Sequence, residues 1–131
     1  MRAGRVIVPL LLLGLLAAYA GVWRSGVAAT EREAARLTGG QPQAGREAMI
    51  ALGCVACHQV PGFYGTKPQV GPPLAGFALR SFVAGATENT PDKLMQFIRD
   101  PRSIAPRSAM PKLPMSESQA RDLAAFLYTL R

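Results

Sequence analysis

Histidine and cysteine are nearly missing from this chain of 131 residues, which has one histidine and two cysteines. Three such residues cannot supply the four ligands that a structural zinc site of cysteine and histidine needs. Aromatic residues are also scarce, at 7%, so a small core would hold few large rings. Small domains often need a covalent staple or a cofactor, and a bound macrocycle would supply the missing apolar mass.

The charge is positive but weakly clustered. The formal net charge is +7, and from Ser25 onward 12 basic and 8 acidic residues leave +4. This excess is too scattered for a nucleic-acid interface. It suits transient docking to an acidic protein surface, where charge mainly raises the association rate.

An uncharged apolar run extends from Val6 to Trp23 and is followed by Arg24. As a helix it would span about 27 Å, just enough for the hydrocarbon core of a bilayer. A cleaved signal peptide is the alternative, because the small residues around Ala20 could precede a cleavage site. We favour the uncleaved anchor, since apolar residues continue to Trp23. Both interpretations export the rest of the chain.

The chain divides by composition into three parts. Residues 1–23 form the transmembrane anchor or signal peptide, residues 24–43 a linker, and residues 44–131 the globular domain. Within the linker, Thr30–Leu37 is polar with a helical pattern, and the glycines and proline that follow break it.

The globular part predicts an all-α fold. Capping signals and apolar spacing indicate three main helices, at about Gly45–Leu52, from Thr90 to Asp100, and from Ser116 to Leu130. A further short helix is expected near Leu79–Gly85. Pro- and Gly-rich loops fill Pro61–Pro73 and Pro101–Pro114, and we see no alternating strand pattern of useful length.

The two cysteines and the histidine form one motif, Cys54-Val55-Ala56-Cys57-His58. This is the haem-attachment spacing, in which each thiol adds to a vinyl group at the porphyrin edge and the histidine reaches the iron. A redox-active disulfide with this spacing needs a βαβ setting, which we do not see. A structural disulfide leaves His58 unexplained. The motif therefore predicts one covalently bound haem c with His58 as an iron ligand.

A six-coordinate iron needs a second axial ligand, and the chain has no second histidine to supply it. Candidates are thioethers. We prefer Met110, because the following Pro111 would stiffen the loop that must hold the ligand. Met115 remains the alternative, although it abuts the Ser116 cap. Two further methionines are more typical of packing residues, Met49 and Met95.

These features resemble class I c-type cytochromes, in particular small bacterial monohaem members, over about Ala44 to Arg131. The motifs follow in the family's order: the attachment motif, Gly71-Pro72-Pro73-Leu74, Met110-Pro111 and a helix over Asp122–Leu130. The resemblance implies three main helices around one haem, with the last helix crossing the first near the haem edge.

The resemblance also implies roles for single residues. The Pro72 carbonyl would orient His58, Leu74 would pack on the haem, and Arg80 would lie near a propionate. Mitochondrial-type members bond a propionate with a tryptophan, which this domain lacks. Tyr64 is a candidate substitute.

We therefore expect a one-electron carrier, not an enzyme, with no nucleic acid and no small-molecule substrate among its partners. Its haem domain would face the periplasm from the bacterial inner membrane, or be soluble there after signal cleavage. Expected partners are a quinol-oxidising complex, a terminal oxidase or a dehydrogenase of a respiratory chain. One alternative is a haem c subunit of a larger oxidase or dehydrogenase. Another is a haem sensor or peroxidase, in which Met110 leaves the iron.

Overall fold

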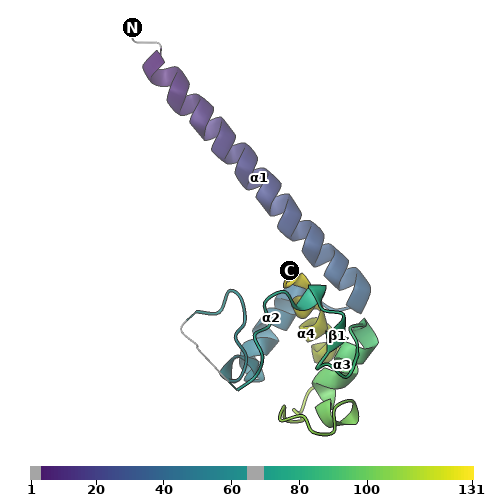
Figure 1. Cartoon of the computed structure of the whole chain (residues 1–131). Helices are drawn as coiled ribbons and strands as arrows, with labels where there is room; N and C mark the ends of the chain where they lie inside the picture. The colour runs from purple at the N-terminus through teal and green to yellow at the C-terminus, as the bar shows by residue number, and fades with distance from the viewer. Residues whose placement is uncertain (1–3, 65–69) are drawn as a thin grey trace. The chain divides into compact units, whose positions relative to one another are not determined.

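A computed structural model describes residues 4–64 and 70–131 (Figure 1). The chain divides into two compact units, Met1–Thr30 and Glu31–Arg131. Part of the expected loop between Pro61 and Pro73 lies outside the described residues, as does Arg2. The second unit begins within the stretch expected as a linker.

The N-terminal helix α1 runs without a break over Gly4–Thr38. It is long and apolar enough to cross a membrane: the span Ile7–Thr38 has a mean hydropathy of 1.8, and none of its most apolar window is buried. The expected helical stretch Thr30–Leu37 is confirmed, and it continues the apolar segment directly. Residues 30–37 contain no proline or glycine, so nothing in their composition interrupts the helix before Gly39.

The last turn of α1 belongs to the second unit. Ala34 is only 2% exposed and Thr38 is buried. The Thr38 hydroxyl donates to the Ala34 carbonyl at 2.8 Å and accepts from the Gly40 backbone N–H at 3.2 Å. Gly39 has a φ of +68°, a left-handed conformation that ends the helix. The start of the unit is therefore a capped helix end instead of a loose tether.

Helices α2 (Pro42–Ala51) and α4 (Glu117–Thr129) cross at very close range. A Cβ atom on Gly45 would lie 1.9 Å from the Asp122 carbonyl oxygen and 2.8 Å from the Phe126 Cβ. Only glycine lets the two backbones approach this closely. The Asp122 carboxylate also accepts from the Gln41 backbone N–H at 2.7 Å. The first helix was expected to begin at about Gly45, but α2 begins at Pro42. Proline is favourable in the first turn of a helix, so the earlier start is compatible with this residue.

The capping signals predicted the other two helices. Helix α3 covers Pro91–Arg99, with Thr90 as its N-cap. Helix α4 begins after Ser116, whose hydroxyl accepts from the Gln119 N–H at 3.1 Å while the Gln119 side chain accepts from the Ser116 N–H at 2.9 Å. Both N-caps and the capping box are confirmed.

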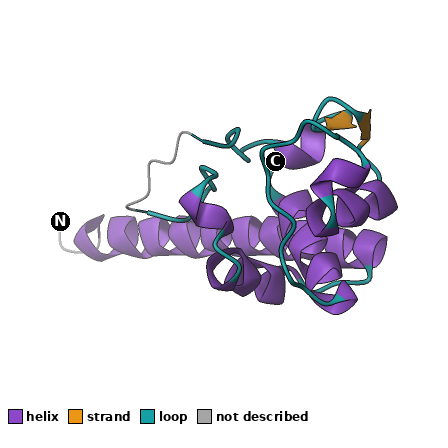
Figure 2. Ribbon diagram, turned by 90° about the horizontal axis from the view of Figure 1, so that it is seen from below, coloured by secondary structure: helices purple, strands orange, loops and turns teal. Residues whose placement is uncertain are grey.

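The short helix expected near Leu79–Gly85 is wrong. A 3₁₀ turn, η2 (Phe77–Leu79), is followed by a hairpin of β1 (Phe82–Val83) and β2 (Thr87–Glu88). Three residues separate the paired positions Val83 and Thr87. The Ala86 N–H donates to the Val83 carbonyl at 3.0 Å, and both central residues of this turn, Ala84 and Gly85, have positive φ, as in a type I′ turn. Figure 2 shows this hairpin beside the helices. Two further 3₁₀ turns complete the described elements, η1 (Cys54–Ala56) and η3 (Pro101–Ser103).

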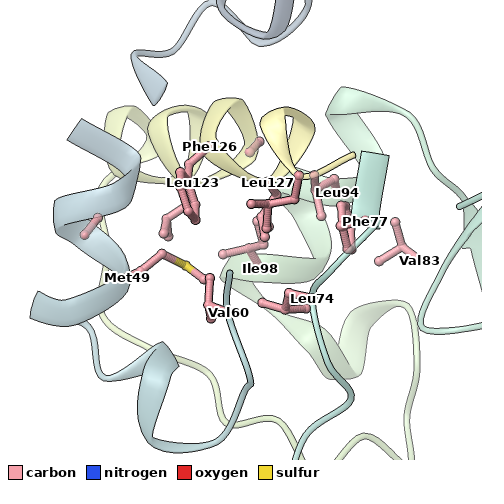
Figure 3. Packing of buried hydrophobic residues seen from close by; sticks show 13 residues of the cluster. Met49, Val60, Leu74, Phe77, Val83, Leu94, Ile98, Leu123, Phe126 and Leu127 are labelled. Atoms are coloured by element: carbon pink, nitrogen blue, oxygen red, sulfur yellow. The ribbon is translucent and has the colours of Figure 1, made fainter. Parts of the chain in front are cut away.

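The hydrophobic core lies between the helices and the segments that follow η1 and precede β1. Leu123, Phe126 and Leu127 extend from α4 toward Met49 on α2 (Figure 3). Four further members come from α3 and the intervening segments: Val60, Leu74, Leu94 and Ile98. The helices therefore converge on one cluster that also borders the candidate site.

The α2–α4 crossing makes a first prediction. Gly45→Ala should destabilise the second unit by about 1–3 kcal/mol, because the new Cβ forces two backbones apart. Thermal unfolding of the full chain in mild detergent measures this loss. Gln43→Ala, on the exposed side of the same helix, should change the stability by less than about 0.5 kcal/mol. Equal effects of the two variants would contradict the role of the crossing.

Candidate functional site

A single cavity of about 1010 Å³ gathers the residues selected from the sequence. Ligand pockets usually measure about 300–1,000 Å³, so this one suits a large ligand. Seven residues from distant parts of the chain line it, namely Cys54, Cys57, His58, Pro72, Leu74, Arg80 and Met110. The structure therefore brings all seven predicted site residues to one place.

Most of the cavity wall is apolar and is shared with the hydrophobic core. Leu74, Phe77 and Leu94 are buried side chains that also face the cavity. Leu123 and Leu127 add the inward face of α4. Such a wall favours an apolar ligand.

The attachment motif begins directly after the left-handed glycine that ends α2. Gly53 has a φ of +73°, and its N–H donates to the Ile50 carbonyl at 3.0 Å. This left-handed glycine ends the helix. The next residues form the tight turn η1, in which the Cys57 and His58 N–H groups both donate to the Cys54 carbonyl, at 3.2 and 3.0 Å. The turn places both cysteines and the histidine along one side of the cavity.

A second segment, Gly71–Leu74, is bound against this motif. The Gly71 N–H donates to the Cys57 carbonyl at 2.8 Å, and the Leu74 N–H donates to the Gln59 carbonyl at 2.8 Å. A Cβ on Gly71 would lie 2.5 Å from Cε1 and 2.6 Å from Nδ1 of His58. The His58 imidazole can therefore occupy this position only because Gly71 has no side chain.

The His58 ring has one nitrogen engaged by the backbone. Its Nδ1 lies 2.8 Å from the Pro72 carbonyl oxygen. A carbonyl only accepts, so this hydrogen bond requires the proton on Nδ1 and leaves Nε2 with a free lone pair. A backbone carbonyl on the other ring nitrogen is the usual arrangement of a metal-binding histidine, and it raises the basicity of the ligand.

The two thiols at the cavity edge are free and partly buried. Burial raises the pKa of the Cys54 thiol, which keeps it protonated at neutral pH. Within residues 4–64 and 70–131 no three His, Cys, Asp or Glu side chains cluster to hold a metal ion. The motif is therefore not half of a larger site for a bare metal ion in the described part of the chain.

Met110 reaches the cavity from the loop between η3 and α4. Its backbone N–H donates to the Ser108 hydroxyl at 3.2 Å, which helps to fix the loop. An ion pair closes the base of the loop, with Lys112 Nζ 2.7 Å from the Asp100 carboxylate. This hydrogen-bonded lysine holds the pKa of Asp100 below its usual range. The thioether of Met110 is thus carried by a loop anchored at both ends.

The other methionines occupy different places. Met95 and Met115 line a separate cavity of about 570 Å³ between α3 and the start of α4. Neither lines the larger cavity. Met49 does line it, but from α2, where the residue is 2% exposed and packed in the core. Met110 is therefore the one loop methionine in the described chain that shares a cavity with His58.

The arginine and the tyrosine proposed for a propionate differ in position. Arg80 lines the cavity, and its guanidinium donates to the Pro73 carbonyl and, at 3.2 Å, to the Ala75 carbonyl. Its Cζ also lies 5.3 Å from the centre of the Phe77 ring. Tyr64 is 95% exposed and does not line the cavity, so the structure does not favour the suggestion that it replaces the tryptophan.

One part of the cavity wall has no counterpart among the residues expected from the sequence. The hairpin residues Phe82 to Ala86 line the cavity. Asn-Gly or Asp-Gly would have been a strong signal for a hairpin, and this chain has Ala84-Gly85 at the turn instead. The signal in the sequence was therefore weak.

The donor set and the volume of the cavity fit a haem. Two thiols, an imidazole nitrogen with a free lone pair and a thioether line the same space, and apolar side chains form most of the wall. Imidazole and thioether are the axial ligands typical of c-type haem iron.

Comparison with known proteins agrees with this fit. The family profile for cytochrome c matches residues 42–131. The chain is also 34% identical over 110 residues to a cytochrome c oxidase subunit 2 of Alkalihalophilus pseudofirmus. The alignment covers 83% of this chain but only 30% of that relative, so the chain spans less than a third of its length. The chain belongs to the cytochrome c family.

Proposed function

We propose that this chain is a membrane-anchored one-electron carrier, with His58 and Met110 as the two axial ligands of its haem iron. The observation that carries the proposal is the single cavity that both side chains line together with Cys54 and Cys57. The haem domain would face the periplasm and work within a respiratory chain. The chain would have no catalytic residue and no small-molecule substrate.

As a member of the cytochrome c family, the chain binds haem c covalently. When bound, this group supplies a one-electron couple between ferric and ferrous iron. In our proposal the thiols of Cys54 and Cys57 provide the two thioether links. His58 presents Nε2 to the metal because Pro72 holds the proton on Nδ1.

The surrounding residues would favour electron transfer by limiting rearrangement. The imidazole is fixed by the Gly71 backbone and the Pro72 carbonyl. The Met110 loop is held by Ser108 and by the Asp100–Lys112 ion pair. A rigid pair of ligands remains bound in both oxidation states, and a thioether ligand raises the potential. The buried apolar wall acts in the same direction, since it disfavours the extra charge of the ferric state.

Helix α1 would act as the membrane anchor. Its apolar side chains are exposed along the whole of its apolar stretch, which suits a lipid environment. An anchored carrier searches for its partners in the plane of the membrane and at a higher effective concentration. Partners in this proposal are a quinol-oxidising complex on one side and an oxidase or dehydrogenase on the other.

A second candidate function is a haem c subunit of a larger oxidase complex. One observation favours it, the similarity to a protein named cytochrome c oxidase subunit 2. In this alternative the chain would pass electrons within a stable complex instead of moving between complexes.

Replacement of the distal ligand tests the proposed ligation. Met110→Ala should abolish the far-red absorption band that reports a methionine–iron bond, and the vacant position should bind carbon monoxide in the ferrous protein. Met115→Ala is the matched control and should keep the band, because Met115 lines the other cavity. A band that survives in Met110→Ala and disappears in Met115→Ala would overturn the assignment. Fast carbon monoxide binding by the unchanged protein would favour a sensor.

The packing of Gly71 on the imidazole gives another prediction. Gly71→Ala should displace the His58 ring, because the added Cβ would lie within 3 Å of three ring atoms. We expect a partly high-spin absorption spectrum, while the haem stays covalently attached through Cys54 and Cys57. Pro73→Ala, an exposed residue in the same segment, should keep the low-spin spectrum. An unchanged spectrum of Gly71→Ala would contradict the prediction, because it would mean that the added Cβ does not displace the His58 ring.

Fractionation tests the anchor and separates the two candidate functions. Haem staining of a denaturing gel should reveal the full-length chain in the membrane fraction of cells able to attach haem c. A stained band of lower mass in the soluble fraction would instead indicate a cleaved signal peptide. After extraction in mild detergent, a carrier should run alone in size exclusion, whereas a subunit should run with oxidase polypeptides.

A further inference from the structure

One polar residue in the second unit joins the η2 segment to α4 and has no role in the function proposed above. Asn89 lies between β2 and the N-cap of α3 and is partly buried. Its side-chain nitrogen donates to the Phe77 carbonyl at 3.2 Å and to the Arg80 carbonyl at 2.9 Å. Its backbone N–H donates to the Ser81 carbonyl at 2.9 Å. Asn89 therefore holds both ends of the η2 turn and the residue that follows it.

Tyr128 on α4 determines which way the Asn89 amide points. Its hydroxyl donates at 3.1 Å toward the side-chain oxygen and the backbone oxygen of Asn89. With the oxygen occupied by a donor, the amide nitrogen is directed at the two carbonyls. Burial raises the pKa of Tyr128, so the hydroxyl stays a donor throughout the neutral range. All the donors and acceptors of this side-chain amide find partners in the described chain.

The residue held in this way is the arginine of the haem cavity. The Asn89 amide binds the main chain of Arg80, and the Pro73 and Ala75 carbonyls bind its guanidinium. Among the residues that line the cavity, Arg80 and Arg107 are the cationic ones, and Arg107 stands on an exposed loop. The two hydrogen bonds of the Arg80 guanidinium fix a positive charge at the cavity wall, and such a charge acts through space on a redox centre bound in the same cavity. Where the Arg80 main chain lies therefore sets where that charge stands.

We propose that Asn89 is a positioning residue for electron transfer. Together with Tyr128 it holds Arg80 in the cavity wall, and the charge of Arg80 raises the reduction potential of the haem. This inference rests on the proposed function, since it takes the haem to occupy the cavity lined by Arg80. A positive charge near the iron favours the ferrous state, which carries less positive charge. Loosening the η2 turn moves the charge away and lowers the potential.

The test is a double-mutant cycle on the haem-loaded full chain, read as the midpoint potential at pH 7. Arg80→Gln should lower the potential, and Asn89→Ala should lower it by part of that amount. Tyr128→Phe should lower it by less than Asn89→Ala, because it removes one hydroxyl and leaves both amide donors. In the Arg80→Gln background, Asn89→Ala should cause no further shift, since the charge through which it acts is gone.

A matched control separates positioning from general loosening of the fold. Gln119→Ala removes the capping box of α4 and touches neither Arg80 nor Asn89. It should lower the melting temperature and leave the potential at the wild-type value. The proposal is overturned if this control lowers the potential as much as Asn89→Ala does. It is equally overturned if Asn89→Ala has no effect, or has the same effect with and without Arg80.

The two proposals fail in different ways. If the unchanged protein shows no methionine–iron band, His58 and Met110 are not both ligands. The double-mutant cycle, read as the midpoint potential, would still decide the role of Asn89. If Asn89→Ala yields no folded protein, Tyr128→Phe with and without Arg80→Gln gives the same comparison.

Discussion

Several core side chains of the second unit also form the wall of the large cavity. This shared wall is the constraint on which the rest of the unit depends. Side chains such as Leu74, Leu94 and Leu123 pack against one another on one face and border a cavity of about 1010 Å³ on the other. Interiors of proteins are close-packed, so side chains that line a volume of this size need an apolar partner of matching size. The haem c that the family binds is such a partner. Binding the haem and completing the core are therefore the same event.

The close contacts between segments of this unit depend on positions that have no side chain. Gly45 stands at the helix crossing, and Gly71 lies against the His58 imidazole. At both positions a single additional carbon atom would meet a backbone oxygen or an aromatic ring. The absence of a side chain at Gly45 and at Gly71 therefore permits both close contacts.

Much of this arrangement could be predicted from the sequence because its signals are local. The spacing of Cys54, Cys57 and His58 is read directly from the chain, and the caps at Thr90 and Ser116 locate two helices. The placement of the seven site residues needed more than local signals. Motif order and the resemblance to class I c-type cytochromes supplied it, and the structure brings those residues together around one cavity.

Contacts without a local signal could not be predicted. The hairpin after η2 depends on Ala84 in a left-handed conformation that alanine rarely adopts. The burial of Ala34 depends on packing against the rest of the second unit, which the polar composition around it conceals. The hydrogen bonds of Asn89 join residues 9, 12 and 39 positions away in the chain. An isolated asparagine gives no indication of such partners.

The contact between Gln41 and Asp122, 81 positions apart, has a consequence for the order in which the unit assembles. Closing so long a loop costs conformational entropy before any native contact repays it, so contacts of this kind slow folding. In the proposed attachment at Cys54 and Cys57, the haem would be tied near the N-terminal end of this loop. It would then offer the later segments an apolar surface to pack against, and the attachment would contribute to folding as well as to retention of the haem.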